Sequence, residues 1–451
     1  MSKNYEKIKE YLNSNIDKYP HDIYQSLEKE NKELKIIGIT GSYGKTTTLK
    51  IVHEYLKQIG KKSVLFASCG IDLPNSNYNK DSEVEVPLYN ESSVINAISG
   101  AIFYNADYLL LEINERTLSK GYVKDIPFDI RALTNIYSRH NTFEYSEEEY
   151  VNIKKSFFKD INDDEDCICI YGETDKKYLN DLMSINNKQK RVVTSRYIAS
   201  VNGIDEEKVD YLLYQNGERF DSLDGLSFGI KTKNNDYDIN TSLIMPHNSL
   251  NINMALAIVD SIGELNIKEF NKLLNSIIVL GRDEVIKEKG RTIIASITCT
   301  PHLEILKKYK EQGLINNVIL ITGSYGSGYE TWDKEYNSEK FKKYVNESMR
   351  FIYKYILKNV DKVYITSVDN ASSNPETLIN NQIKEIEDKI EYEAILARKE
   401  AIKQAIEKSN IGDVLFISGR GNRAVLCKSS NEIDYFKDMD VVKEVLSNMK
   451  E

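Results

Sequence analysis

A short glycine loop between a predicted strand and a predicted helix constrains this chain more than any other feature. Residues 36–39 form an apolar, strand-like run, and apolar side chains at helical spacing follow over about 46–59. The loop between them is Gly41-Ser42-Tyr43-Gly44-Lys45-Thr46-Thr47. A strand that passes through such a loop into a helix is typical of a parallel sheet, so an α/β fold is predicted.

This loop has the chemistry of an anion site. Glycines let the backbone turn tightly and aim its N–H groups at an anion, and the start of a helix adds partial positive charge. Lys45 would reach the outer phosphates of a nucleotide, and the Thr46 hydroxyl would bind Mg²⁺. The strict G-x-x-x-x-G-K-T spacing is not met, because Ile39 occupies the first glycine position. We predict ATP or GTP binding, with simple capping of the helix as the alternative.

Beyond the loop, predicted strands and helices alternate along the chain. The first strand candidates are 63–68, 107–113, 130–136, 167–171 and 191–195, and helices are predicted over 248–262 and 267–278. A second series of strand candidates lies near 292–297, 317–322, 362–367, 392–396 and 413–418. Such alternation predicts parallel strands with helical crossovers.

A chain of 451 residues is too long to fold around a single hydrophobic core, so two domains are expected. Residues 1–34 are predicted to form a short helical extension. Residues 35–280 then form a P-loop domain with a parallel-rich sheet, and residues 281–451 form a Rossmann-like α/β domain. The run at 39–44 recurs at 321–326, but only the first copy continues into Lys-Thr. We attribute the repeat to chance.

Charge and composition limit the partners. The 60 basic and 69 acidic residues leave a formal net charge of −9, which argues against a nucleic-acid or anionic-membrane partner. No apolar run approaches the ~18 residues of a membrane span. The charged start lacks the apolar stretch of a signal peptide, and five scattered cysteines fit a reducing compartment. A cytoplasmic location is therefore expected, while the oligomeric state stays open.

Several stretches resemble the Mur ligase family, in the same order, over about 35–451. The loop at 40–48 has the form T-G-x-x-G-K-T-T followed by a third Thr, which is the variant seen in that family. The resemblance implies an ATP-dependent ligase that joins a small-molecule carboxylate to an amine, such as an amino acid, through an acyl-phosphate.

The resemblance also implies a magnesium site. A carboxylate that ends a strand beside the loop is where a metal ligand belongs, and Glu112 matches the family's Mg²⁺-binding glutamate. The run 134–140 resembles T-N-x-x-x-D-H, which puts His140 at the metal-binding histidine. Tyr150 and Lys154 then match the family's tyrosine and its carbamoylated lysine. Mg²⁺ would be held by Thr46, Glu112 and His140, with Lys45, Lys154 and His140 as catalytic residues. Capping of a turn by Glu112 is the alternative reading, and Lys154 alone would suggest a solvated lysine.

Two further elements are implied to contact the nucleotide. The run 246–251 resembles H-N-x-x-N, whose asparagines, here Asn248 and Asn251, approach the adenine; an N-cap role for Asn248 is an equal alternative. The run 281–284 resembles the family's G-R-x-E hinge, whose arginine, here Arg282, reaches the ATP phosphates.

Three departures from the family narrow the expected substrates. Only about 34 residues precede the first strand, where UDP-sugar ligases carry a further domain, so a UDP-linked acyl donor is disfavoured. The family's D-Y-A-H-T-P element is replaced by residues 296–301, which removes its usual ribose contact. The family's two motifs for the amino-acid acceptor are also altered. At their positions this chain has Asp369-Asn370 and a turn at 419–423 that carries Arg420 and Arg423.

These two arginines favour a carboxylate on the incoming amine, through paired N–H donors, and disfavour diaminopimelate. A surface loop with solvated arginines is the alternative. For the whole chain, the runner-up hypotheses are a poly-γ-glutamate- or folylpolyglutamate-like synthetase and a nucleotide-binding scaffold without catalysis.

Overall fold

The computed structural model describes residues 5–19, 34–68, 70–74, 90–137, 145–159, 161, 166–215, 221–326, 339–370, 373–429 and 432–449. The chain divides into two compact units, Met1–Ile277 and Ile278–Glu451. This division and the boundary expected at 280 differ only by the segment 278–280. The mixed α/β class predicted from the sequence is confirmed in both units.

Unit 1 is built on one large sheet with the order β11-β10-β8-β7-β6-β5-β1-β4-β2-β3, and β9 pairs with β10. The run from β8 to β2 is parallel, whereas β3 and β9 to β11 are antiparallel. The strands are β1 (Lys35–Thr40), β2 (Ser63–Ala67), β3 (Gly70–Asp72), β4 (Tyr108–Glu112), β5 (Ile130–Asn135), β6 (Ile168–Glu173), β7 (Gln189–Ser195), β8 (Tyr211–Tyr214), β9 (Asp221–Ser222), β10 (Gly225–Lys231) and β11 (Asp236–Thr241).

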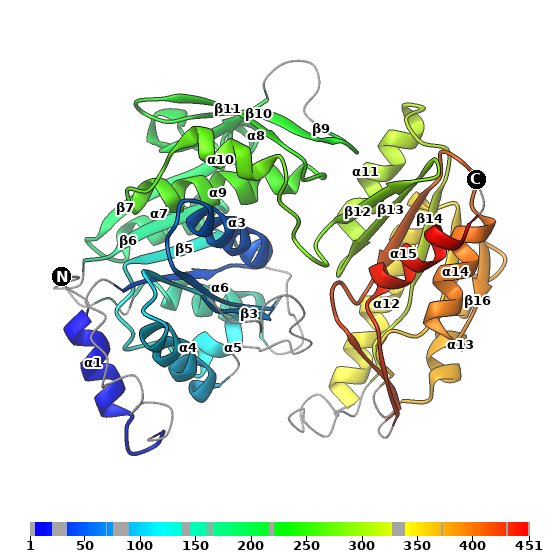
Figure 1. Ribbon diagram of the computed structural model, residues 1–451, viewed down its shortest axis with the longest axis horizontal. Helices are drawn as coiled ribbons and strands as arrows, with labels where there is room; N and C mark the ends of the chain where they lie inside the picture. Colours follow the sequence, from blue (N-terminus) through cyan, green and yellow to red (C-terminus); the bar gives the residue numbers. More distant parts are fainter. Residues whose placement is uncertain are drawn as a thin grey trace. The chain divides into compact units, whose positions relative to one another are not determined.

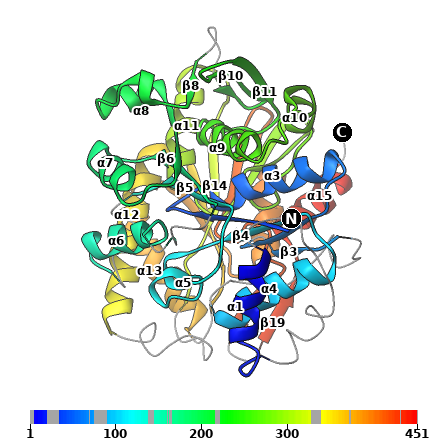
Figure 2. The ribbon, with the colours of Figure 1, turned by 90° about the vertical axis from the view of Figure 1, so that its left-hand side faces the viewer.

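Helices cover both faces of this sheet. Figures 1 and 2 show α3, α9 and α10 on one face and α4, α5 and α6 on the other. The core of the second face joins α1, α4, α5, α6 and α7 to the strands. The helices of unit 1 are α1 (Tyr5–Ser14), α3 (Lys45–Gln58), α4 (Glu91–Phe103), α5 (Glu115–Ser119), α6 (Glu147–Ser156), α7 (Lys176–Ser184), α8 (Arg196–Val201), α9 (His247–Ser261) and α10 (Ile267–Leu274), with a 3₁₀ turn at Glu206–Lys208.

Unit 2 has a sheet of its own, with the order β12-β13-β17-β14-β15-β16, and only β12 is antiparallel to its neighbour. Its strands are β12 (Glu284–Glu288), β13 (Arg291–Ser296), β14 (Val318–Thr322), β15 (Lys362–Ile365), β16 (Glu391–Ala394) and β17 (Val414–Ser418), beside a hairpin of β18 (Val425–Ser429) and β19 (Glu432–Tyr435). Its helices are α11 (Thr300–Glu311), α12 (Glu339–Asn359), α13 (Pro375–Ile386), α14 (Arg398–Lys408) and α15 (Asp438–Asn448).

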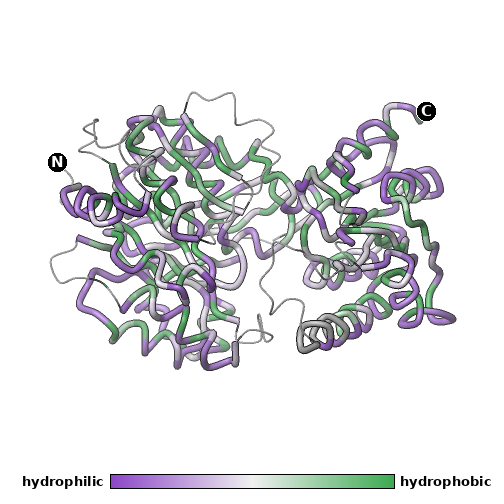
Figure 3. The backbone as a smooth tube through the Cα atoms, turned by 90° about the horizontal axis from the view of Figure 1, so that it is seen from below, coloured by the Kyte–Doolittle hydropathy of each residue, from purple (hydrophilic) through white to green (hydrophobic). Residues whose placement is uncertain are grey.

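The apolar strands form the interior of each unit. In unit 2, α14 and α15 pack their apolar faces on β13, β14, β15 and β17. Figure 3 shows apolar segments, coloured green, along the backbone. No helix of the described residues is long and apolar enough to cross a membrane.

Candidate active site

The glycine loop joins the end of β1 to the start of α3. β1 lies between β4 and β5, so the loop opens beside the carboxyl ends of both neighbours. Gly44 is the N-cap of α3 with φ of 84°, and a Cβ at this position would lie 2.2 Å from Asn251 Oδ1. A left-handed backbone with no space for a side chain explains why glycine is needed here.

The end of β5 holds the loop in place. The Thr134 hydroxyl donates to the Tyr43 carbonyl over 2.6 Å, and the Asn135 side chain both accepts from Tyr43 N (3.0 Å) and donates to Tyr43 O (3.1 Å). The Ser42 N–H donates to the Asn135 carbonyl. Thr134 and Asn135 therefore hold the loop in place, a role that the sequence analysis did not assign to them.

A cluster of oxygen atoms surrounds the first turn of α3. The Thr46 hydroxyl donates to Glu112 Oε2 over 2.8 Å, so two of the three expected metal ligands lie side by side. Ser68, which follows β2, lies with its hydroxyl 2.8 Å from that of Thr46 and donates its N–H to the same Glu112 oxygen over 3.0 Å. Hydroxyl and carboxylate oxygens are the donors that Mg²⁺ prefers, so this set fits the ion. Nothing in the sequence had singled out Ser68.

The loop lysine lies over its own loop. Lys45 Nζ donates to the carbonyls of Gly41 (2.9 Å) and Ser42 (3.3 Å). Its ammonium thus lies against the backbone of the loop. This position suits a group that is to bind the outer phosphates of a nucleotide. His140, the third expected metal ligand, lies outside the described residues.

Helix α6 reaches the loop from the other face of the sheet. A capping box between Ser146 and Glu149 starts the helix and fixes its direction. The Tyr150 hydroxyl lies 2.9 Å from Ser42 Oγ, and Lys154 Nζ donates to Thr40 Oγ1 (3.3 Å) and to Glu115 Oε2 (3.2 Å). Lys154 is completely buried, and burial lowers its pKa to about 8 despite the attraction of Glu115. The sequence analysis missed Glu115.

The two asparagines of α9 lie against the start of α3. Asn251 Oδ1 adjoins Gly44, and its amide donates to Asn248 Oδ1 over 2.9 Å. Asn248 in turn donates to the Ile244 carbonyl over 2.6 Å, and Pro246 is the N-cap of the helix, so the N-cap alternative for Asn248 is wrong. The structure brings this motif to the loop, while contact with an adenine stays a prediction.

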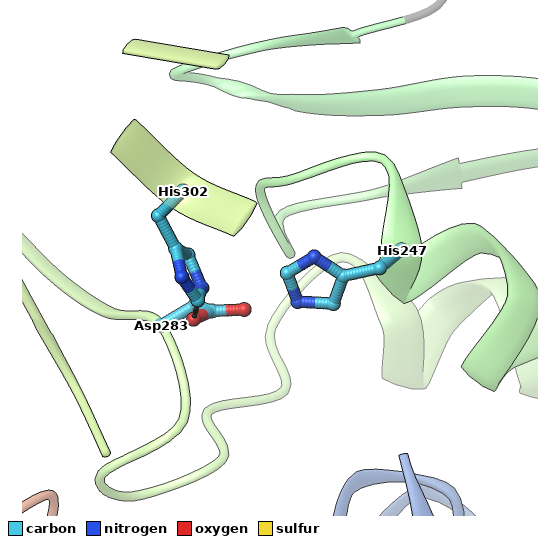
Figure 4. A group of neighbouring side chains, drawn as sticks. All are labelled: His247, Asp283 and His302. Atoms are coloured by element: carbon cyan, nitrogen blue, oxygen red, sulfur yellow. Dashed lines mark hydrogen bonds and ion pairs between the residues drawn. The ribbon is translucent and has the colours of Figure 1, made fainter. Parts of the chain in front are cut away.

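In unit 2, Arg282 lies in a tight turn before β12. The Arg282 N–H donates to the Val279 carbonyl, and Gly281 N–H donates to Glu284 Oε2. The next residue, Asp283, is buried, and its carboxylate lies 2.6 Å from Nε2 of His302 on α11, as Figure 4 shows. The turn that carries Arg282 is thus tied to α11. The role of Arg282 at the ATP phosphates stays a prediction.

The expected acceptor residues meet at the carboxyl ends of β14, β15 and β17. Arg423 Nη1 lies 3.6 Å from Asp369 Oδ2 and donates to the Tyr325 hydroxyl over 3.3 Å. Asn370 donates to the Lys428 carbonyl over 3.0 Å. The run at 321–326, whose likeness to 39–44 we attribute to chance, joins this cluster through Tyr325.

The structure corrects the expectation that Arg420 binds a substrate carboxylate. Its guanidinium is completely buried, donates to Asp438 Oδ1 over 3.1 Å and lies 4.5 Å from the centre of the Phe436 ring. Arg398 forms two more bonds to the same carboxylate, over 2.9 and 2.8 Å. Because this guanidinium is completely buried and ion-paired with Asp438, it is not exposed to a substrate carboxylate, and the predicted binding role of Arg420 is wrong.

Comparisons with known proteins agree with this architecture. Residues 39–259 match the family model described as the Mur ligase middle domain. The chain is 25% identical over 426 residues to the UDP-N-acetylmuramoyl-L-alanyl-D-glutamate–2,6-diaminopimelate ligase of Helicobacter pylori strain J99, covering 93% of this chain and 85% of that protein. It is 24% identical over 441 residues to the UDP-N-acetylmuramyl-tripeptide synthetase of Borreliella burgdorferi, covering 94% of this chain and 78% of that protein.

Solved structures show the same fold. The MurF ligase of Thermotoga maritima in complex with ADP has a TM-score of 0.60 at 15% identity, covering 94% of this chain and 81% of that chain. The folylpolyglutamate synthase of Mycobacterium tuberculosis, complexed with ADP and AMPPCP, has a TM-score of 0.62 at 12% identity, covering 90% and 91%.

The matched middle domain and the similarity to two peptide-bond-forming ligases place this chain among the ATP-dependent ligases that form amide bonds. Within that class, residues 39–259 match the Mur ligase middle domain, and the chain is similar to Mur ligases over more than nine-tenths of its length.

Proposed function

We propose that this ligase uses ATP and Mg²⁺ to activate a small carboxylic acid and couples it to an amine that itself carries a carboxylate. The observation that carries the proposal is the contact between Thr46 and Glu112, which joins the helix of the phosphate loop to the end of β4. A hydroxyl and a carboxylate beside a phosphate loop are the ligands that a phosphate-bound Mg²⁺ needs.

Thr46 and Glu112 hold the ion, and His140 joins them by the resemblance described above. When bound, Mg²⁺ supplies charge neutralisation and polarisation at the phosphate oxygens. Lys45 and the N–H groups of the loop bind the outer phosphates, as the substrate carboxylate attacks the γ-phosphorus in line and ADP leaves. The amine then attacks the acyl-phosphate carbon, and phosphate leaves as the amide forms.

The acceptor is recognised by the cluster at the strand ends of unit 2. Arg423 offers a planar guanidinium for a carboxylate, and Asp369, 3.6 Å away, offers an anion for an ammonium group. Such a pair of opposite charges suits an amino acid. A glutamate-adding ligase is a second candidate, because an arginine at this turn matches a second carboxylate on the acceptor.

The test is ADP formation with MgATP and matched panels of carboxylic acids and amino acids, glutamate among them. We expect ADP formation that depends on an acid and rises with an amine, with an amide as product. Lys45→Ala should lower the rate by at least about 100-fold, because it removes a charge that stabilises the transition state.

The matched control is Lys57→Ala, which removes a partly exposed lysine from the same helix and should leave the rate unchanged. ATP binding without substrate-dependent ADP would instead indicate a nucleotide-binding scaffold. Equal activity of Lys45→Ala and Lys57→Ala would contradict the proposal.

A further inference from the structure

Tyr325 lies between two of the strand ends that form the acceptor cluster of unit 2. It belongs to the segment that follows β14, whereas Gly419 follows β17 directly. The Tyr325 hydroxyl donates to the Gly419 carbonyl and accepts from Arg423 Nη1 over 3.3 Å. The guanidinium carbon of Arg423 lies 5.6 Å from the centre of the Tyr325 ring, within the range of a cation–π contact. One tyrosine thus contacts both the backbone and a charged side chain of the turn at 419–423.

The single proton of the tyrosine hydroxyl fixes the direction of these contacts. A guanidinium offers hydrogen-bond donors only, so the hydroxyl oxygen must accept from Arg423. The hydroxyl proton therefore goes to the Gly419 carbonyl. Replacement of Tyr325 by phenylalanine would remove both hydrogen bonds and keep the ring. Such a variant separates the effect of the hydroxyl from the effect of packing.

The acidic partner of Arg423 lies farther away than a hydrogen bond allows. Arg423 Nη1 lies 3.6 Å from Asp369 Oδ2, whereas the atoms of a hydrogen-bonded guanidinium–carboxylate pair are about 2.7–2.9 Å apart. The Asp369 side chain is 8% exposed and that of Arg423 is 30% exposed, so water screens their attraction only in part. A guanidinium that Tyr325 holds in place does not close onto this carboxylate. Both charges then remain suited to an amino acid that carries a carboxylate and an ammonium group.

The backbone on both sides of this ion pair is fixed by further hydrogen bonds. The Gly326 N–H donates to the Asp369 carbonyl over 2.7 Å. The buried Arg420 donates from Nη2 to the Arg423 carbonyl over 3.1 Å. Because the backbone is held at both residues, the spacing of the two charges depends on side-chain contacts, and Tyr325 supplies one of them through its hydroxyl and its ring.

We propose that Tyr325 is a positioning residue that holds Arg423 off Asp369 and thereby sets the preference of this site for amines that carry a carboxylate. The inference rests on the proposed function, because recognition of the acceptor by Arg423 and Asp369 is part of it. Tyr325 acts through Arg423 and makes no contact with the reacting atoms.

Crystal structures of the full chain at pH 7, for the wild type and Tyr325→Phe, test the positioning directly. In Tyr325→Phe the guanidinium of Arg423 should close onto the Asp369 carboxylate, to about 2.8 Å, whereas the wild type should keep the wider spacing. An Arg423 side chain that stays in its wild-type place in Tyr325→Phe would overturn the proposal. This comparison needs no substrate and no turnover, so failure of the proposed function remains distinguishable from failure of this inference.

Kinetics test the consequence for specificity, with the amino acid that best supports ADP formation in the panel above and with its α-carboxamide. Tyr325→Phe should raise the KM of the amino acid at least about tenfold, because a hydrogen bond that orients a charged group is lost. The KM values of the carboxamide and of ATP should not change, whereas a merely structural defect would raise all three. Equal rises for the amino acid and its carboxamide would therefore also contradict the proposal.

Two further variants complete the comparison. In an Arg423→Ala background, Tyr325→Phe should have no additional effect on the KM of the amino acid, since a residue that acts through another loses its effect with that partner. Tyr435→Phe is the matched control, because it removes the hydroxyl of a tyrosine of unit 2 that is 62% exposed. This control should match the wild type with both amines.

Discussion

At the scale of single residues, Lys154 shows how strongly surroundings decide chemistry. A lysine on a charged helix would ordinarily be solvated, yet here it is buried with its pKa lowered to about 8 by burial. Removal of Glu115 and removal of Lys154 are expected to have different effects on stability. Loss of Glu115 leaves a buried cation, whereas loss of Lys154 leaves a carboxylate that water still reaches.

We therefore predict that Glu115→Gln lowers the free energy of unfolding by about 3 kcal/mol, while Lys154→Met changes it by less than about 1 kcal/mol. Urea denaturation at pH 7 measures both. The opposite order would mean that the pair is not the buried one described above.

The pH dependence gives an independent check. The folded pKa of Lys154 lies below the ordinary value of 10.5, so the unfolded chain binds more protons between pH 8 and 10.5. The lysine's contribution to stability therefore rises with pH across this window. Lys154→Met should lack that rise relative to the wild type.

Sequence reasoning placed single residues correctly where a motif carried them, even for distant partners such as Thr46 and Glu112, which lie 66 residues apart. The loop residues 41–47 and their helix follow from one short pattern. Glu115 lies 39 residues from Lys154, and Asp438 lies 18 residues from Arg420, so neither pairing could be inferred from spacing. The buried state of both cations follows from tertiary packing, which the sequence does not display.

At the scale of elements, the parallel strands were the predictable part, because each is a short apolar run. The antiparallel strands β9 to β11 and β12 were not predicted, nor was the parallel strand β8. β11, for example, reads Asp236–Thr241 with several exposed polar residues, a pattern that a search for apolar runs passes over.

The packing of α3 on β2 and β3 depends on a buried histidine. His53 Nδ1 lies 2.9 Å from Ser63 Oγ, and its Nε2 lies 2.9 Å from Asp72 Oδ2. Burial lowers the pKa of His53 below 6.5, partly offset by Asp72. The unfolded chain therefore binds this proton first as the pH falls below 6.5, and stability declines.

We predict that His53→Gln weakens this acid dependence by up to about 1.4 kcal/mol per pH unit, the slope of one proton. Urea titrations between about pH 4.5 and 8 measure the slope. Burial opposes ionisation of Asp72, but His53, Lys50 and Lys57 outweigh it and lower the Asp72 pKa, so its own contribution is lost only at lower pH. Identical slopes for variant and wild type would exclude His53 as the source.

The second prediction at this scale concerns the stability of the turn before β12. Gly281 has φ of 67°, and a Cβ there would lie 2.1 Å from the Asn422 backbone nitrogen. Gly313 has a similar φ of 71° but meets nothing within 4 Å. Gly313→Ala should therefore cost about 1 kcal/mol from backbone strain alone, whereas Gly281→Ala should cost clearly more than about 2 kcal/mol.

Chemical denaturation of the two variants compares these costs within one unit. Gly281 packs on the turn that carries Arg423, so Gly281→Ala should also impair the acceptor cluster and raise the KM for the amine. Equal losses of stability in the two variants would show that the turn at 419–423 moves aside without difficulty.

At the scale of the whole molecule, the chain holds two sheets, each with helices packed on it and a core of its own. The phosphate loop, Glu112 and Lys154 lie in unit 1, whereas Arg423 and Asp369 lie in unit 2. Binding of nucleotide to the loop should therefore stabilise unit 1 by mass action, since a ligand that binds only the folded state raises its stability.

We predict that calorimetry of the full chain resolves two unfolding transitions, since separate cores need not unfold together. A non-hydrolysable ATP analogue with Mg²⁺, at about 100 times its Kd, should stabilise one transition by about 2.7 kcal/mol and leave the other in place. Lys45→Ala should abolish that shift, and Lys57→Ala should preserve it, which assigns the responsive transition to unit 1. A single transition that moves as a whole would show instead that the two cores unfold as one cooperative unit. In that case a mutation in either core would lower the stability of the phosphate loop as well.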